Sequence, residues 1–468
     1  MKKTLLVVAL VAAQFSVSFS QESLDIIRSR GVGILEDVKS MVKEKYYDPT
    51  FHGIDLEKNF KAAKEQIKKA ERNGQVNGII AQFLLDFNDS HLFFLPPGRA
   101  LSVDYGFRMK MIGNDCFISA VKKGSDAEKQ GVRIGDKVYS LETFEPTRDS
   151  LWKLMYFYTA LSPQPKIRLA LIDETNNIRQ LMIEAKILNE SQQDAEAKRK
   201  AREAEEKAKA KTKDERKRET YAYRCGEASA DVMVCRLNSF SVPTDEIDKM
   251  MKVVGSHKGF VLDLRNNGGG YVATMKHLIG YFFDHPVKVG TEKMRKSSKD
   301  EVADPRGPDK FFKGDLAVLV DSGSGSASEV FARVIQLEKR GTVVGDQSAG
   351  AVMTSIRGVN AWTRYIAADK GAEGVGIEGG VSKAATLYGV SVTIADLIMS
   401  DGKSLEITGV KPDVLALPTG ADLRSKQDVV IAKAAGLLGA TIDPVAAGKL
   451  LVDEEPEKTG IGDPDGDD

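Results

Sequence analysis

The sequence has little of several features that would define a protein class at once. Its three cysteines are too few for a disulfide-stapled scaffold or a cysteine-rich zinc module. Its 67 basic and 67 acidic residues cancel, so no net charge draws the chain to nucleic acid or to an anionic membrane. Beyond the first 20 residues, no apolar run approaches the length of a membrane-spanning helix. The remaining composition, 42% hydrophobic over 468 residues, predicts a soluble globular protein of two or three domains.

The N-terminus indicates export. A short basic start, Met1 to Lys3, precedes an apolar run over residues 5–15 and the small residues Ser18 and Ser20. This order predicts a secretory signal peptide over residues 1–20, with an N-terminal anchor helix as the alternative. No cysteine lies near the cleavage point, which argues against a lipoprotein anchor. We therefore expect a periplasmic or secreted protein without stable membrane insertion.

Residues 21–100 are predicted to form a small helical domain. Apolar side chains recur at three- and four-residue spacing from Ile26 to Val42 and again from Phe60 to Ile67. The segment ends in a polar loop that carries Ser90 and His91.

Residues 101–187 have a different pattern. Strand-like runs at 107–111, 116–121, 166–172 and 180–185 surround a short helix signal that ends at Gly131 and a Gly135-Asp136 turn. This arrangement resembles the core of a PDZ domain, and Tyr105, Gly106 and Phe107 resemble the loop that receives a peptide's C-terminal carboxylate. Such a domain implies a peptide partner bound by strand addition. The alternative is another small β-rich domain with a turn at Gly135.

The second half of the chain is predicted to be a linker followed by an α/β domain. Residues 188–220 are rich in Ala, Glu, Lys and Arg, as in a charged helical linker with no apolar face to bury. Residues 221–435 alternate apolar strands with helical segments, which predicts strands that are buried on both faces. Cys225 and Cys235 flank a predicted hairpin and could pair in an oxidising compartment, leaving Cys116 free. Residues 436–468 are expected to be a C-terminal tail.

Two glycine-rich turns follow buried strands of the α/β segment, at residues 263–270 and 321–329. A strand that runs through glycines into a helix presents free backbone N–H groups, which suit a phosphate or the oxyanion of acyl transfer. Neither a GxGxxG motif nor a P-loop lysine is present, so a nucleotide site has weak support. Ser326 lies where a nucleophile would be exposed beside such donors, with Ser324 and Ser328 as alternatives.

Together, the two turns resemble those of the C-terminal processing peptidases, a PDZ-containing serine peptidase family. The similarity also includes residues 236–240, 344–346 and 409–414, with order and spacing kept over about 85–420. It implies an α/β fold with a catalytic domain of the ClpP/crotonase-like type, an inserted or preceding PDZ domain and a small helical N-terminal segment. It also implies a nucleophile at Ser326 and an oxyanion hole from the amides of Gly268, Gly269 and Ala327.

One position departs from that family. The processing peptidases carry a lysine base in the turn after the Val-Gly-Glu strand, and Ala351 stands at that position here. A Ser/Lys dyad is therefore absent, so either another residue is the base or the site is inactive.

The tricorn-type peptidases, a sister branch, use serine, histidine and glutamate with a second serine beside the histidine. Ser90 and His91 resemble that Ser-His pair, and Glu406 matches the branch's glutamate before a Gly-Val-x-Pro-Asp segment. The chemistry is coherent, because an imidazole can take the proton of a serine hydroxyl and a carboxylate can orient the ring. The alternatives are a structural histidine and a plain turn carboxylate; His277, in an apolar helix, is expected to serve packing.

We therefore predict an exported serine endopeptidase that acts on proteins or peptides, recognised through free C-termini by the PDZ domain. No metal-ligand motif occurs, and no metal or cofactor is expected. Neither nucleic acid nor a membrane is an expected partner, and a homo-oligomer is left open. The main alternative is an inactive peptide-binding scaffold, for which Ala351 would mark lost activity. A non-peptide hydrolase or apolar-ligand carrier on the same fold is a third option.

Overall fold

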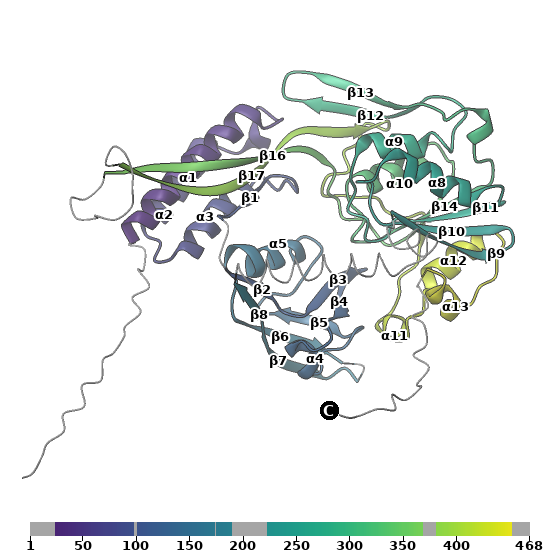
Figure 1. Cartoon of the computed structure of the whole chain (residues 1–468), viewed down its shortest axis with the longest axis horizontal. Helices are drawn as coiled ribbons and strands as arrows, with labels where there is room; N and C mark the ends of the chain where they lie inside the picture. Colours follow the sequence, from purple (N-terminus) through teal and green to yellow (C-terminus); the bar gives the residue numbers. More distant parts are fainter. Residues whose placement is uncertain (1–23, 98–100, 174, 190–221, 368–380, 452–468) are drawn as a thin grey trace, which may run out of the picture.

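The computed structural model describes residues 24–97, 101–173, 175–189, 222–367 and 381–451. Three regions are visible in Figure 1: a helical segment beside a long β-hairpin, a small β-sheet domain, and an α/β domain around a central sheet. The predicted signal peptide and most of the charged linker lie outside the described residues. Within the described residues, no helix combines the length and the apolar character that crossing a membrane requires.

The N-terminal segment is helical, as its periodicity predicts. Its elements are α1 (Leu24–Lys45), the short η1 (Phe51–Gly53), α2 (Leu56–Lys68), α3 (Asn73–Leu85) and the strand β1 (Phe93–Leu95). Leu35, Val38 and Val42 recur on one face of α1 and are fully buried. This core also contains Tyr388 and Val390 from a distant strand. The helical segment is therefore not an independent domain, because the second half of the chain completes its core.

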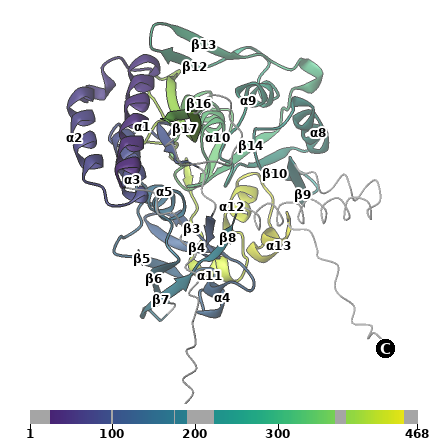
Figure 2. The same ribbon diagram turned by 60° about the vertical axis from the view of Figure 1, so that its left-hand side comes forward.

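That distant strand belongs to a second sheet. The strands are β12 (Val287–Met294), β13 (Ser298–Ala303), β16 (Met353–Ala367) and β17 (Val381–Met399), in the order β1-β17-β12-β13 with β16 paired to β17. The β16–β17 hairpin runs along α1 in both Figure 1 and Figure 2. The sequence did not predict these strands. Their pairing is the physical link between the helical segment and the α/β domain.

The β-rich segment holds an antiparallel sheet in the order β3-β4-β5-β6-β7. Its strands and helices are β3 (Phe107–Ile112), β4 (Asp115–Val121), α4 (Asp126–Lys129), β5 (Lys137–Leu141), α5 (Leu151–Tyr156), the π-helix η2 (Phe157–Leu161), β6 (Lys166–Ile172) and β7 (Ile178–Glu184). A separate pair, β2 (Leu101–Asp104) and β8 (Lys186–Asn189), closes the segment. All four predicted strands are present, and β3 lies at the edge of its sheet.

The α/β domain is built on a six-stranded sheet in the order β18-β15-β14-β11-β10-β9. Its strands are β9 (Tyr223–Ser229), β10 (Val232–Leu237), β11 (Gly259–Asp263), β14 (Asp315–Val320), β15 (Thr342–Gly345) and β18 (Val414–Leu415). The strands β10, β11, β14, β15 and β18 are parallel. The mixed α/β fold is therefore as predicted.

Helices cover both faces of this sheet, which explains why its strands are apolar throughout. The helices are α8 (Thr244–Val254), α9 (Val272–Ile279), α10 (Ala327–Leu337), α12 (Val429–Leu437) and α13 (Pro444–Lys449), with the short α11 (Gly420–Arg424) and η3 (Pro308–Lys310) in connections. In α8, Ile247, Met250, Met251 and Val254 follow the i, i+3, i+4, i+7 spacing and are buried.

One sequence-based boundary needs correction. The predicted tail, residues 436–468, begins inside α12, and Ala440, Ala447 and Leu451 pack with that helix on the central sheet. The α/β domain therefore extends at least to Leu451.

Cys225 and Cys235 lie opposite each other in β9 and β10 and form a disulfide, while Cys116 is free and buried.

Candidate active site

The two glycine-rich turns lie side by side at one end of the central sheet. They follow β11 and β14, which are parallel neighbours, so both turns leave the same edge. The second turn is bonded to the first: Gly325 N donates to Asn267 O (3.0 Å), and Ser324 Oγ donates to Leu264 O (2.8 Å). The sheet topology thus brings together the segments that the sequence singled out.

Ser326 has the backbone geometry of an exposed nucleophile. Its φ of 53° and ψ of −119° lie in a region that a residue with a side chain rarely adopts, at the residue before α10. Ser326 is half-buried, whereas Ser324 and Ser328 are fully buried. The Ser328 hydroxyl donates to Asn267 O (2.8 Å), as that of Ser324 does to Leu264 O. Among the three candidate serines, only Ser326 is therefore open to a substrate.

The first turn provides backbone donors beside Ser326, but not all those predicted. Gly269 N donates to Asn267 Oδ1 (2.9 Å), so this amide is already used, and its role as an oxyanion donor is corrected. Gly269 is still required as glycine, since its φ is +100° and a Cβ there would lie 2.6 Å from Ser326 Cβ. In the described part of the chain, the amides of Gly268 and Ala327 donate to no protein atom.

A buried carboxylate fixes the loop on the other side of Ser326. Glu329, in the first turn of α10, is 0% exposed. Its oxygens accept hydrogen bonds from Ser326 N (2.9 Å), Ser348 Oγ (2.6 Å), Gly350 N (2.7 Å) and Ala351 N (2.9 Å). Burial raises the pKa of Glu329, although these donors oppose the shift. No pattern in the sequence indicated this role.

One peptide group connects Ser326 to Glu406. Ser326 N also donates to Ala351 O (3.0 Å), and Val352 N donates to Glu406 Oε2 (2.9 Å). The carbonyl of Ala351 and the N–H of Val352 belong to the same planar unit, so they point in opposite directions from it. The predicted nucleophile and the predicted glutamate therefore flank a single peptide bond.

Glu406 is joined in turn to the Ser90–His91 pair. Glu406 Oε1 accepts from Ser90 N (2.7 Å), and its Oε2 accepts from Ser90 Oγ (3.0 Å). Ser90 Oγ lies 2.8 Å from His91 Nδ1. The fold thus brings Glu406 to the adjacent residues Ser90 and His91, which lie more than 300 positions earlier in the chain. Ser90 lies between the carboxylate and the ring.

When Glu406 is ionised, the direction of hydrogen-bond donation in these contacts is fixed. The single hydroxyl proton of Ser90 is donated to Glu406, so the Ser90 oxygen must accept from the proton on His91 Nδ1. The ring's Nε2 then carries the lone pair that a general base needs. Burial, together with the nearby charge of Asp89, raises the pKa of Glu406 to about 7, despite the opposing hydrogen bonds from Ser90 and Val352.

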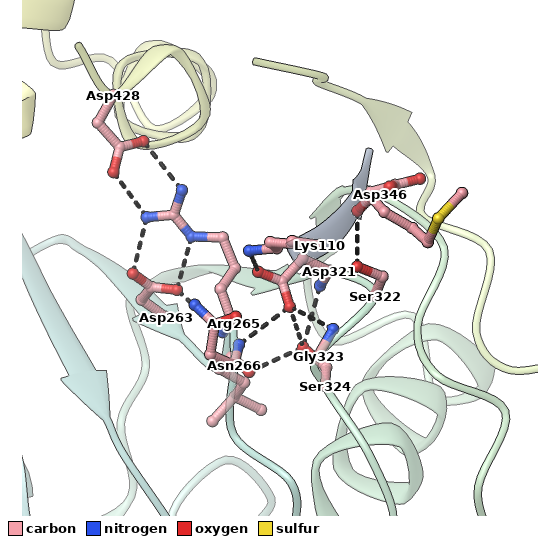
Figure 3. A network of polar contacts seen from close by, with 12 residues as sticks. Lys110, Asp263, Arg265, Asn266, Asp321, Ser322, Gly323, Ser324, Asp346 and Asp428 are labelled. Atoms are coloured by element: carbon pink, nitrogen blue, oxygen red, sulfur yellow. Dashed lines mark hydrogen bonds and ion pairs between the residues drawn. The ribbon is translucent and has the colours of Figure 1, made fainter. Parts of the chain in front are cut away.

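A further network, which the sequence did not predict, lies beneath and beside the two turns (Figure 3). Asp263, at the end of β11, pairs with Arg236 and Arg265, and Arg265 also pairs with Asp428 before α12 (2.7 Å). Burial disfavours the charge on Asp263, but the two guanidinium groups outweigh it and hold its pKa well below the usual range. This network anchors the first turn to the C-terminal helices.

The β-rich segment contacts both turns near Ser326. Asp321, at the start of the second turn, pairs with Lys110 of β3 and accepts from Asn266 N (2.9 Å), as Figure 3 shows. Ser322 Oγ donates to Met111 O (2.6 Å), and Arg148 reaches Asp346 after β15 (2.5 Å). The β3–β4 hairpin is therefore docked on the second glycine-rich turn, which carries Ser326.

The predicted peptide-binding loop is partly closed. The Tyr105 hydroxyl donates to Tyr158 O (3.1 Å), and both Tyr105 and Phe107 are buried in the core of this segment. Gly106 N donates to Asp104 Oδ1 (2.9 Å), so this amide is not free for a carboxylate in this conformation. The edge position of β3 remains the feature suited to strand addition.

Two remaining expectations concern histidine and metals. His277 Nε2 lies 2.6 Å from Asp248 Oδ1 between α9 and α8, a contact that suits the packing role predicted for it. Over the residues that the structure describes, no three His, Cys, Asp or Glu side chains are grouped to hold a metal ion.

Comparisons with known proteins show which proteins this chain is similar to. Residues 231–416 match the model of Peptidase family S41. This match and the curated relatives support the predicted resemblance to the C-terminal processing peptidases, which are serine peptidases.

The relatives with assigned functions are similar to this chain over part of their length. One is the chloroplastic C-terminal processing peptidase of Tetradesmus obliquus, 23% identical over 336 residues, which are 66% of each protein. Another is the carboxy-terminal-processing protease of Bartonella bacilliformis, 33% identical over 109 residues and 23% of each. The tail-specific protease of Haemophilus influenzae is 29% identical over 127 residues, 26% of this chain and 17% of that protein. The chain thus spans less than two thirds of these relatives.

A solved structure extends the fold similarity to nearly the whole chain. Mature CPAF complexed with lactacystin has a TM-score of 0.61 and 13% sequence identity, covering 91% of this chain and 99% of that one. At this identity the likeness concerns the fold alone.

Proposed function

We propose that this chain is an exported serine endopeptidase in which Ser326 is the nucleophile and His91, oriented by Ser90 and Glu406, is the general base. The observation that carries the proposal is the shared Ala351–Val352 peptide group. Its carbonyl accepts from Ser326 N (3.0 Å) and its N–H donates to Glu406 Oε2 (2.9 Å). The strained, half-buried Ser326 and the Ser90–His91 turn thereby belong to one connected site.

The reaction would follow acyl-enzyme chemistry. His91 Nε2 takes the proton of Ser326 Oγ while that oxygen attacks the scissile carbonyl carbon. The carbonyl oxygen becomes an oxyanion, which the free amides of Gly268 and Ala327 stabilise. The imidazolium then protonates the leaving amine, and the C–N bond breaks. A water molecule, deprotonated by His91, releases the acyl group from Ser326. Ala351 supplies only its backbone, so no lysine takes part.

The finer features of the sequence prediction fit the same proposal. The edge strand β3 would accept an extended peptide beside Tyr105, Gly106 and Phe107, as in a PDZ domain. Its substrates would be proteins or peptides with free C-termini. The Cys225–Cys235 disulfide supports residence in an oxidising compartment, in keeping with the predicted signal peptide.

A non-catalytic peptide-binding scaffold is the second candidate. Ala351 favours it, because the side chain beside Ser326 has no amine to act as base. In that case Ser326 would keep its backbone geometry without reacting.

Fluorophosphonate labelling separates the two candidates. We expect the purified protein to be labelled at Ser326 and to cleave an unfolded protein substrate. Ser326→Ala should abolish both, and His91→Ala should lower kcat by about 10⁴-fold or more, because triad members act as a unit. His285→Ala is the matched control, since His285 is an exposed histidine paired only locally with Asp284.

Each result is informative. A wild-type protein that is folded, unlabelled and inactive supports the scaffold. Labelling that survives Ser326→Ala would contradict the nucleophile assignment. A His91→Ala variant as active as His285→Ala would contradict the base.

A further inference from the structure

The turn that carries Ser90 and His91 is held by a buried carboxylate outside the predicted catalytic set. Asp89 is only 3% exposed. Its Oδ1 accepts from His91 N (2.9 Å), Leu92 N (3.1 Å) and Thr393 Oγ1 (2.7 Å), and its Oδ2 accepts from the Tyr46 hydroxyl (2.9 Å). Four donors thus converge on one side chain.

These donors come from three separate parts of the chain. Tyr46 lies just after α1, Thr393 lies in β17, and the two amides belong to the turn itself. Tyr46 is fully buried, and burial together with Asp89 raises the pKa of its hydroxyl far above the usual range, so it stays a neutral donor. Asp89 therefore fixes the backbone of His91 relative to the helical segment and to the sheet.

We propose that Asp89 is the positioning residue of this site: it sets the backbone of the Ser90–His91 turn, and its negative charge acts on Glu406, to which the adjacent Ser90 is hydrogen-bonded. This inference rests on the proposed peptidase function. Asp89 touches neither substrate nor the reacting atoms, and it acts through His91 and Glu406.

The electrostatic part of the proposal has a definite sign. A negative charge at residue 89 disfavours a second one at Glu406, and Asp89 contributes to the raised pKa of Glu406, after burial. The titratable groups that interact directly with this pair are Tyr46 and Tyr47 after α1, His91 in the turn and Asp396 in β17. Beyond them, Asp48 faces the two tyrosines, and His52 in η1 and Lys293 in β12 face Asp396. Removing the Asp89 charge should let Glu406 ionise at lower pH.

Two substitutions separate position from charge. Asp89→Asn keeps an Oδ1 that can accept from His91, Leu92 and Thr393, and its amide can donate to the Tyr46 oxygen. Asp89→Ala removes every contact. Asp37→Asn is the matched control, because the Asp37 carboxylate of α1 also accepts a tyrosine hydroxyl from β17, that of Tyr388 (2.9 Å), away from the turn.

The first measurement does not depend on activity. In a Ser326→Ala background, hydrogen exchange of residues 90–92 should become at least about 10-fold faster in Asp89→Ala, and stay near the parent rate in Asp89→Asn and Asp37→Asn. The second is the pH profile of kcat/KM with Ser326 intact. Asp89→Ala should lower kcat/KM by about 100-fold. Asp89→Asn should shift the acid limb, the low-pH side of the profile, to lower pH by about half a unit or more.

If hydrogen exchange of residues 90–92 is as slow in Asp89→Ala as in Asp37→Asn, the positioning role is overturned. An acid limb that stays in place in Asp89→Asn, with only a lower plateau, would overturn the electrostatic role. If the wild-type protein cleaves nothing, the proposed function fails, and the exchange measurement still decides whether Asp89 holds the turn.

Discussion

At the scale of single residues, Glu406 links the site to pH. Its raised pKa means that ionising it in the folded protein costs free energy relative to the unfolded chain, so its contribution to stability is present at low pH and is lost as pH rises through about 7. Raising the pKa from 4.5 to about 7 corresponds to at most about 3 kcal/mol.

We therefore expect the difference in unfolding free energy between the wild-type protein and Glu406→Gln to change with pH. The unfolding free energy of the wild-type protein minus that of the variant should fall by up to about 3 kcal/mol between pH 4.5 and pH 8. Urea unfolding at several pH values measures it. The other buried carboxylates, Glu329 and Asp396, are present in both proteins and cancel. A difference that is constant over this range would show that Glu406 is not perturbed as described.

The residues proposed to react were easier to name from the sequence than the residues that hold them in place. Ser326, His91 and Glu406 could be named as candidates because each lies in a short segment that resembles a segment of the known peptidase branches. Asp89, Glu329 and Asp321 act through contacts between segments 19 to more than 300 residues apart, and no local pattern reports such contacts. Gly269 was assigned a free amide because spacing cannot reveal that the neighbouring Asn267 side chain occupies it.

At the scale of elements, the β3–β4 hairpin contacts both the second glycine-rich turn and the loop after β15. Arg148 joins the hairpin to the loop after β15, donating to Gly113 O (2.9 Å), to Gln347 O (2.9 Å) and to the largely buried carboxylate of Asp346. Breaking such a pair leaves an uncompensated charge, which costs about 3 kcal/mol or more.

Arg148→Ala should therefore loosen both sides of this interface without unfolding the β-rich sheet. Hydrogen exchange should accelerate in residues 107–113 and 345–351, while β6 and β7 keep their protection. Arg168→Ala is the control, since Arg168 pairs with Glu142 inside the β-rich segment at 3.7 Å and is half exposed. Equal exchange in the two variants would mean that the hairpin is held by other contacts.

Elements, like residues, were predictable where a local pattern marks them and not where they depend on distant contacts. The buried strands of the α/β domain were predicted as a class, because an apolar run between turns leaves few alternatives. The hairpin β16–β17 was missed, because its residues 353–367 and 381–399 mix polar and apolar side chains without a clear period. Its role depends on packing against α1, which a local pattern does not record.

At the scale of the whole molecule, the C-terminal helices complete the α/β domain. Val430, Ile431, Ala434 and Ala435 of α12 cover one face of the central sheet, and Asp428 pairs with Arg265 beneath the first turn. Each fully buried Val or Ile contributes about 1.5–3 kcal/mol, so losing the helix removes a large share of a typical stability of about 5–15 kcal/mol.

A chain that ends at Leu451 should keep the melting temperature of the full chain, whereas one that ends at Gln427 should not fold. Circular dichroism and size-exclusion chromatography test both. A third truncation, ending at residue 435, distinguishes the predicted domain end at 435 from the observed one at Leu451. If residues 436–468 were only a tail, this truncated chain would behave like the full one.

The Ala351–Val352 peptide group also bears on how such sites diverge in evolution. Both of its contacts, to Ser326 and to Glu406, are made by backbone atoms, and the side chain at 351 takes part in neither. The side chain at 351 can therefore change without breaking either contact. Under the proposed function, the residue that supplies the base would then be free to change while the backbone around Ser326 keeps its course.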